Sequence, residues 1–353
     1  MAEYLIQDTT LTGIADKIRV LSGTEETLTP AEMNSNLNTF NNELSAINVE
    51  QDGLIEQLKN LFGAEFPEAD TLDGCSWENI SKVAASGLAS NFWSVGDCKK
   101  VTLNGTIGTL SLSNYETYVY IIGFDHNGAA NTIDFGTFKT SKTDGRDIAL
   151  IDAAYNTYTT DGTLNFNIQH WGNANYGGWA GCDLRYDILG STDVAPSGYG
   201  AAVTSGRVGY DASSTCATNP VANTIMAALP FELRAVMKPM SVYTDNVCGG
   251  TGDIETNVAA SVDYLPLLAE FEIFGTREYA NSAEQNYQVQ YAYYINGNSK
   301  RKYRHSSIFY TTNWWQRSFY HSDVGGVCYT STSSTKKWSS TYYSYGLAPI
   351  FRV

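Results

Sequence analysis

The sequence is short of the residues on which metal and redox sites depend. It has only four histidines, and its six cysteines are spread over the chain without a C-x-x-C pair. Zinc knuckles and thioredoxin-type sites need closely spaced cysteine or histidine ligands, so neither is expected. We therefore predict no metal and no other cofactor, and we interpret the cysteines as free, buried thiols.

Basic residues and long apolar runs are scarce as well. The chain has 22 Lys and Arg against 37 Asp and Glu, a net charge of −15. This balance argues against a nucleic-acid partner, because phosphate binding depends on cations that release counterions. No apolar run approaches the roughly 18 residues of a membrane helix, so we expect no membrane insertion. With 353 residues, the chain can form one large domain plus an accessory segment, or two domains.

The N-terminal part has helical periodicity. Apolar residues recur every three or four positions from Leu11 to Leu21, and Thr29-Pro30-Ala31-Glu32 matches a capping box with proline at the first helical position. Apolar side chains then alternate at four- and three-residue steps up to Gly63, which is the spacing of a coiled-coil seam. The seam residues are Met33, Leu37, Phe40, Leu44, Ile47, Gln51, Leu54, Leu58 and Leu61.

So narrow an apolar stripe needs a partner helix. The seam can pack against copies of itself, or against the Leu11–Leu21 helix folded back as a hairpin, and we favour self-association. A polar seam residue such as Gln51 often fixes register and copy number, but it does not decide between two and three chains. Residues 1–62 are therefore predicted to be a helical oligomerisation and tether segment.

Beyond this segment the pattern changes twice. Residues 63–90 are rich in turn residues and are predicted to be a linker with one short helix over Trp77–Leu88. Residues 91–353 mix short strands with short helices, so the fold class is α+β. Strands are expected at Lys100–Gly105, which ends in an Asn-Gly turn, at Tyr118–Gly123 and at Ile133–Phe138, and helices at Ala180–Ile188 and within Pro220–Lys238.

Seven short motifs follow one another in this region. They are Trp93–Asp97, Ile122–Asn127, Gly178–Arg185, Leu229–Arg234, Leu265–Gly275, Trp314–Ser318 and Gly346–Phe351. The series resembles the C-type-lectin-fold modules that form the C-terminal part of many tail-fibre proteins of phages and prophages of gut bacteria. Some of these relatives are variable proteins of diversity-generating retroelements. The formylglycine-generating enzyme shares this lectin-like fold.

The resemblance implies a C-type-lectin-like, ligand-binding domain over residues 91–353. The opening Tyr4–Leu11 is similar to N-terminal segments of phage tail and baseplate-associated proteins, which implies other tail proteins as partners. By analogy the chain is a homotrimer in the phage virion, made in the bacterial cytoplasm, or else a protein of the bacterial cell surface. The calcium-binding triplets of animal lectins are missing, and Cys328 lacks the close second cysteine of the formylglycine-generating enzyme.

We find no residue pattern that predicts catalysis. The histidines are scattered without H-E-x-x-H spacing, and Asp125-His126 is explained by a strand end. Glu270 and Glu272 form the only close carboxylate pair inside a motif, and on a strand they would face one side, as a polysaccharide depolymerase would need. We predict that the chain is not an enzyme, and we keep the depolymerase as an alternative.

The strongest compositional signal lies near the end of the chain. Between Tyr287 and Tyr345 there are 11 of the 24 tyrosines, together with Trp314, Trp315 and Trp338, among Ser, Thr, Asn, Asp and His. Such a mixture is typical of a binding surface, because tyrosine and tryptophan combine large contact area with a polar group. Aromatic residues are also favoured on sheet faces, which is the structural alternative.

We divide this segment between framework and ligand contact. Trp315, Arg317, Pro349 and Phe351 match the recurrent motifs and are predicted to be structural. The predicted ligand-binding residues are Phe319, Tyr320, His321, Asp323, Tyr329, Trp338, Tyr342 and Tyr343. In retroelement-diversified relatives, adenine-directed change of Asn codons yields the residue types found in Phe319–Asp323, so the resemblance implies a diversified surface here.

The expected function is that of a receptor-binding adhesin of a phage tail or prophage, with a bacterial surface protein or glycan as its receptor. A purely structural tail component, in which the tyrosines form a subunit interface, is a further alternative. The basic segment Lys300–Arg304 is interleaved with tyrosine and can either bind an anionic polymer or form a solvated loop.

Overall fold

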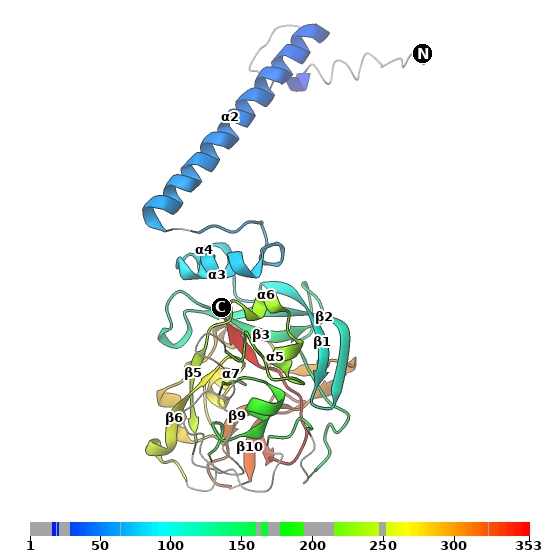
Figure 1. The fold of residues 1–353 in the computed structure, drawn as a ribbon, viewed down its shortest axis with the longest axis vertical. Coiled ribbons are helices and arrows are strands. Elements are labelled where there is room, and N and C mark those ends of the chain that lie inside the picture. Colours follow the sequence, from blue (N-terminus) through cyan, green and yellow to red (C-terminus); the bar gives the residue numbers. More distant parts are fainter. Residues whose placement is uncertain are drawn as a thin grey trace, which may run out of the picture. The chain divides into compact units, whose positions relative to one another are not determined.

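The computed structural model describes residues 16–18, 20, 29–63, 65–159, 164–168, 177–193, 215–246, 252–323 and 325–353. The chain divides into two compact units, Met1–Ala64 and Glu65–Val353. Helices and short strands alternate along the second unit, so the fold is mixed α+β (Figure 1). In the described part of the chain, no helix combines the length and the apolar character that a membrane span requires.

The first unit contains the long helix α2, Pro30–Phe62. Its N-terminus has the predicted capping box: the Thr29 backbone N–H donates to the Glu32 carboxylate at 2.7 Å, and the Glu32 N–H donates to the Thr29 hydroxyl at 3.4 Å. The seam residues Leu44, Ile47 and Leu54 are 46%, 58% and 53% exposed. Of the helix expected over residues 11–21, residues 16–18 and 20 are helical, and the others lie outside the described residues.

The main sheet of the second unit is antiparallel, with the order β1-β2-β3-β12 (Figure 1). Its strands are β1 Cys98–Ile107, β2 Leu110–Phe124, β3 Ile133–Lys139 and β12 Ile350–Arg352. The pair β3–β12 places the last strand of the chain beside one from much earlier in the sequence, with Phe351 opposite Phe135. The last motif of the sequence therefore completes the sheet that the first strands begin.

The predicted turn at Asn104-Gly105 is wrong. Strand β1 runs through both residues, and the register with β2 shifts between Leu103 and Gly105, which marks a bulge. Gly105 has a φ of 124°, a conformation that glycine adopts without steric cost. The chain reverses after Ile107, so the Asn-Gly pair bends a strand in place of ending it.

The second unit also contains three smaller sheets and several short helices. The sheets have the orders β11-β10-β9, β4-β7-β8 and β5-β6. Their strands are β4 Ile148–Ala149, β5 Met240–Asp245, β6 Val258–Asp263, β7 Lys302–Arg304, β8 Ser307–Thr312, β9 Trp314–Phe319, β10 Gly326–Thr330 and β11 Lys336–Ser340. The helices are η1 Leu72–Gly74, α3 Trp77–Ala85, α4 Ala89–Phe92, η2 His126–Gly128, η3 Leu184–Ile188, α5 Ile225–Ala228, α6 Phe231–Arg234, η4 Glu255–Asn257, α7 Glu270–Phe274, η5 Ser282–Asn286 and α8 Ala292–Ile295.

The segment expected to be a linker contributes to the core of the second unit. Helix α3 begins behind Ser76, whose hydroxyl accepts the Asn79 N–H, and it buries Trp77, Ile80 and Val83. The Trp77 ring lies edge-on to Phe135 at 5.5 Å and is 6.0 Å from Phe351. Residues 65–90 are thus part of the same compact unit as the sheet.

Buried ion pairs connect segments that are distant in the sequence. Arg352 of β12 donates two hydrogen bonds to the Asp134 carboxylate of β3, at 2.6 and 2.8 Å. Arg185 donates to Asp263 at 2.6 Å, and both side chains are buried. Because a buried charge is tolerated only when it is paired, these contacts specify which segments meet.

The thiols behave as predicted within the described residues. Cys75, Cys98, Cys182, Cys216 and Cys328 are buried and free. Burial raises the pKa of the Cys98 and Cys328 thiols, so both stay protonated and unreactive near neutral pH. Cys248 lies outside the described residues.

Candidate ligand-binding surface

The candidate surface is built on the sheet β11-β10-β9. Strand β10 pairs antiparallel with both neighbours, so residues just after β9 lie close to residues of β11. Tyr320 follows β9 and stacks on Trp338 of β11, with ring centroids 4.8 Å apart and ring planes 26° apart. Tyr279 lies edge-on to Tyr320 at 5.6 Å. We call Tyr279, Tyr320, His321 and Trp338 the Tyr320 cluster.

Gly326 makes room for this stacking. A Cβ atom at position 326 would lie 2.8 Å from the Tyr320 Cβ and 3.2 Å from the Trp338 Cε3. Such distances are too short for carbon atoms, so a side chain here would displace one of the two rings. Glycine is therefore needed on β10 because of its small size, and the backbone at this position has no left-handed φ.

His321 and Asp323 extend the cluster with polar groups. The His321 imidazole lies 3.7 Å from the Asp253 carboxylate, and Arg277 donates to the same carboxylate at 2.8 Å. The Asp323 carboxylate accepts the Gly325 N–H at 2.7 Å and so shapes the turn before β10. His321 thus offers a polar group beside the rings, whereas one oxygen of Asp323 already serves the backbone.

A second group of rings surrounds Tyr343. Tyr158 packs against Tyr342 at 5.0 Å and against Tyr343 at 5.5 Å, and Tyr345 lies 5.9 Å from Tyr343. Tyr345 in turn contacts Tyr329 at 4.8 Å and Tyr155 at 6.3 Å. We call these residues the Tyr343 cluster: Tyr155, Tyr158, Tyr329, Tyr342, Tyr343 and Tyr345.

The hairpin β10–β11 connects the two clusters. Tyr329 lies on β10, Trp338 lies on β11, and the Ser339 hydroxyl hydrogen bonds to the Tyr345 hydroxyl at 3.2 Å. Trp338 is 40% exposed and Tyr158 is 50% exposed. Burial raises the pKa of Tyr345 to about 12, so its hydroxyl remains a neutral hydrogen-bonding group over the physiological range. The result is a partly exposed aromatic surface with polar groups between the rings.

The structure brings six of the eight predicted ligand-binding residues to partly exposed positions. They are Tyr320, His321, Asp323, Tyr329, Trp338 and Tyr343. Phe319 is only 1% exposed, because it is the last residue of a strand whose side chains are all buried, and Tyr342 is 7% exposed behind Tyr158. These two residues support the surface from below and offer little area to a ligand.

Sequence reasoning missed three residues of the surface. Tyr155, Tyr158 and Tyr279 lie outside the segment 287–345, and tertiary contacts bring them to it. Their isolated positions in the sequence give no signal comparable to the tyrosine density that marked the terminal segment. Only the fold reveals their place.

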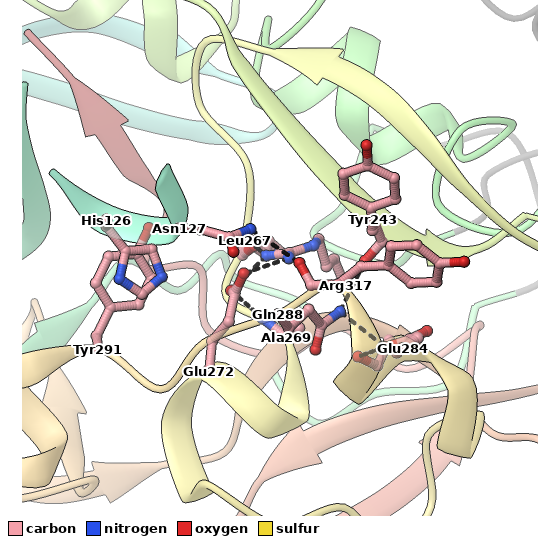
Figure 2. A network of polar contacts seen from close by, with 12 residues as sticks. His126, Asn127, Tyr243, Leu267, Ala269, Glu272, Glu284, Gln288, Tyr291 and Arg317 are labelled. Atoms are coloured by element: carbon pink, nitrogen blue, oxygen red, sulfur yellow. Dashed lines mark hydrogen bonds and ion pairs between the residues drawn. The ribbon is translucent and has the colours of Figure 1, made fainter. Parts of the chain in front are cut away.

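The residues predicted to be framework are buried. Trp315, Arg317 and Phe351 are at most 1% exposed, and Pro349 is also buried. Figure 2 shows the Arg317 guanidinium between the Glu272 carboxylate and the Leu267 carbonyl, to which it donates at 2.7 Å. Burial alone would raise the pKa of Glu272, but the charge and hydrogen bonds of Arg317 outweigh it and lower that pKa.

The carboxylate pair that a depolymerase would use lies elsewhere than expected. Glu270 and Glu272 are on helix α7, not on a strand, and both are buried. The Glu270 carboxylate accepts backbone N–H groups from Glu278, Tyr279 and Ala280, while Glu272 pairs with Arg317. Both side chains are engaged in structural contacts, so they do not form a pair facing a groove.

The remaining candidate for a reactive site, Asp125-His126, is also structural. His126 is 9% exposed, and its ring stacks on Tyr291 with centroids 3.5 Å apart (Figure 2). Burial lowers the pKa of His126, which favours the neutral imidazole. The described residues contain no group of three or more His, Cys, Asp or Glu side chains placed to hold a metal ion.

Comparisons with known proteins give no relative from which a role for this surface could be transferred. No protein-family model, no curated protein and no solved structure matches the chain.

Proposed function

We propose that the chain is a receptor-binding protein of a phage tail or prophage, and that the aromatic surface binds a ligand on a bacterial cell. The observation that carries this proposal is the gathering of the Tyr320 and Tyr343 clusters around one hairpin, with Trp338 40% and Tyr158 50% exposed. Binding hot spots are enriched in tyrosine and tryptophan, because these side chains give large contact area at low conformational cost.

The proposal includes a C-type-lectin-like fold for residues 91–353. It is supported by the ordered motifs and by the part they take in the core, where Arg317, Glu272, Trp315 and Phe351 hold the framework below the surface. The proposal also includes retroelement-driven diversification of Phe319–Asp323. Within that range Tyr320, His321 and Asp323 are partly exposed and can vary without disturbing the core, whereas Phe319 is buried and belongs to it.

We further propose that α2 joins copies of the chain, as a homotrimer, and attaches them to other tail or baseplate proteins. Exposed apolar residues along its seam, such as Leu44 and Ile47, support this part of the proposal. Several weak sites on one coiled coil gain avidity through their high effective concentration. Such a protein would act in the virion by multivalent binding, without covalent chemistry.

The test is binding of fluorescently labelled full-length protein to a panel of gut bacterial cells by flow cytometry. The variant Tyr320→Ala/Tyr329→Ala/Tyr343→Ala removes rings from both clusters. The matched control is Phe231→Ala, which removes a 60% exposed ring from α6, at the opposite end of this unit from β10 (Figure 1). We expect a strain that binds the parent and the control but not the triple variant.

Equal binding by the parent and the triple variant would refute the proposed site. A chain that assembles through the aromatic surface but binds no strain would favour the structural tail component instead.

Removal of residues 1–62 should weaken cell binding far more than binding at a single site, since only avidity is lost. Equal losses in both assays would contradict the avidity argument.

A further inference from the structure

A pocket of about 650 Å³ lies outside the aromatic surface. The loop after β3 and the segment before β7 form its walls, and Val95-Gly96 and Tyr293 contribute to the lining. Its volume falls within the range of small-molecule sites, about 300 to 1,000 Å³. Four cationic side chains line it: Lys139, Lys142, Arg146 and Arg301. In a chain with a net charge of −15, this local excess of positive charge requires a reason.

The carboxylates at the pocket do not cancel these charges. Asp147 is buried and is balanced by two cations, Lys139 at 3.6 Å and Lys302 at 4.0 Å. The Tyr120 and Tyr293 hydroxyls also donate to Asp147, so its oxygens are already occupied. Asp144, the other carboxylate in the lining, is exposed to solvent. Lys142 lies 3.6 Å from Asp73, a carboxylate outside the lining, so the positive charge that remains in the pocket is mainly that of Arg146 and Arg301.

Two arginines are free to meet an anion. The Arg146 guanidinium lies 4.7 Å above the Tyr303 ring and donates to the Ile308 carbonyl at 2.9 Å, and its other N–H groups donate no hydrogen bond to the described residues. Arg301 is exposed and makes no ion pair with the described residues. A guanidinium held in this way binds carboxylate or phosphate oxygens through paired hydrogen bonds.

The rest of the lining suits a sugar. The partly buried Tyr303 ring carries the Arg146 guanidinium on one face, while the Asn298 amide and the Thr143 and Ser299 hydroxyls can hydrogen bond to sugar hydroxyls. The Asn298 Nδ2 already donates to the Tyr293 carbonyl at 2.8 Å, so its Oδ1 is oriented as an acceptor. We propose that this pocket binds a saccharide unit that bears an oxyanion, either a carboxylate or a phosphate.

The site is distinct from the aromatic surface. Tyr303 contacts Arg146 of the pocket, whereas the next residue, Arg304, lies over Tyr155 at 4.5 Å and over Tyr310 at 5.4 Å. The two side chains therefore contact different groups, and the register of β7 with β8 shifts between Tyr303 and Arg304. In the basic segment Lys300–Arg304, Arg301 and Tyr303 thus line a defined pocket, Lys302 is buried beside Asp147, and Arg304 supports the Tyr343 cluster.

The test is isothermal titration calorimetry of the full chain with four probes: D-glucuronate, D-glucose 6-phosphate, D-glucose and inorganic phosphate. We expect at least one anionic sugar to bind about tenfold more tightly than both glucose and inorganic phosphate. Preference for one anionic sugar over the other identifies the oxyanion. Glucose binding as tightly as the anionic sugars, inorganic phosphate binding as tightly, or no binding by any probe would each overturn the proposal.

A pair of charge-matched variants locates the site. Arg301→Gln removes a pocket cation, and it should weaken the binding of the anionic sugar about tenfold without changing the unfolding temperature, because the side chain is exposed. Lys82→Gln removes an exposed cation of α3 that is not part of the pocket, and it should change binding less than about twofold. Equal effects of the two variants would place the sugar elsewhere.

The triple tyrosine variant should bind the sugar like the parent. This result would distinguish the sugar pocket from the aromatic surface.

Discussion

Tyr320 and Trp338 stack directly across Gly326, on three consecutive segments of one small sheet. The two rings belong to the loop after β9 and to β11, and the strand between them carries no side chain where they meet. Trp338 therefore packs one face against Tyr320 while it remains 40% exposed.

Gly326→Ala should disturb this contact. The new Cβ would lie 2.8 Å from the Tyr320 Cβ, so we expect a loss of about 1 to 3 kcal/mol in the free energy of unfolding. The neighbouring Gly325→Ala is the control, since its Cβ would meet only the Asp323 Oδ1 at 3.5 Å. Urea unfolding measures both, and equal stability of the two variants would contradict the tight fit at position 326.

Glu272→Gln should cost far more stability than Asp253→Asn. The first change leaves the fully buried Arg317 without its charge partner, for which we expect a loss of about 3 to 5 kcal/mol. The second weakens the partly exposed pair with Arg277, which contributes less than about 1 kcal/mol. Chemical denaturation distinguishes the two, and similar losses would mean that the Glu272–Arg317 pair is not buried in solution.

Stability should fall as the pH rises through the range between the unfolded and folded pKa values of Glu284. Burial raises the pKa of Glu284 from 4.5 to about 7. Between these pH values the folded protein keeps a proton on Glu284 that the unfolded chain has lost. The free energy of unfolding therefore decreases as the pH rises, by a total on the order of 3 kcal/mol. Above pH 7 this contribution is constant.

Glu284→Gln should remove that slope, because an amide does not titrate. Urea unfolding at pH 5 and about pH 8 provides the comparison. Ser318→Ala serves as a second variant: the Ser318 hydroxyl donates to the Glu284 carboxylate at 2.6 Å and favours its charged form, so its loss should extend the slope to higher pH. A slope unchanged by Glu284→Gln would assign the pH dependence to another group.

Ile47→Asp should dissociate the oligomer that we propose for α2. Ile47 lies on the seam and is 58% exposed in the single chain, so a carboxylate there would have to be buried between helices. Val49→Asp is the control, because Val49 is 71% exposed but lies off the seam. Sedimentation velocity should show a monomer for the first variant and the parental mass for the second. A monomeric parent would refute the coiled coil.

Local features of the fold could be predicted from the sequence. The capping box of Thr29 and Glu32 depends on residues three positions apart, and it forms as the sequence indicates. The Asn104-Gly105 turn also has a local signal, but pairing with β2 carries the strand through it. Glu270 and Glu272 would face one side on a strand, but they lie in the first turn of helix α7, where the Glu272 carboxylate accepts the backbone N–H of Ala269. Tertiary pairing thus overrides short-range signals.

The candidate site was predictable only in part for the same reason. Tyrosine density marked the segment that carries Tyr320, Tyr329 and Tyr343, but it did not separate exposed rings from buried ones. Phe319 and Tyr320 are adjacent, but Phe319 ends β9, whose side chains are all buried, whereas Tyr320 follows the strand and is partly exposed. Tyr279 reaches the site only through contacts between distant segments, which no sequence window contains.

The pairing of β3 with β12 also affects how the protein is made. Asp134 meets Arg352 only after the ribosome has synthesised both, and they are 218 positions apart. Until then the edge of β3 is open, and the carboxylate of Asp134 has no counter-charge from β12. Folding with so many long-range contacts is slow, so the nascent chain exposes an unpaired strand for much of its synthesis. We expect newly made chains to depend on chaperones that shield this edge until β12 arrives.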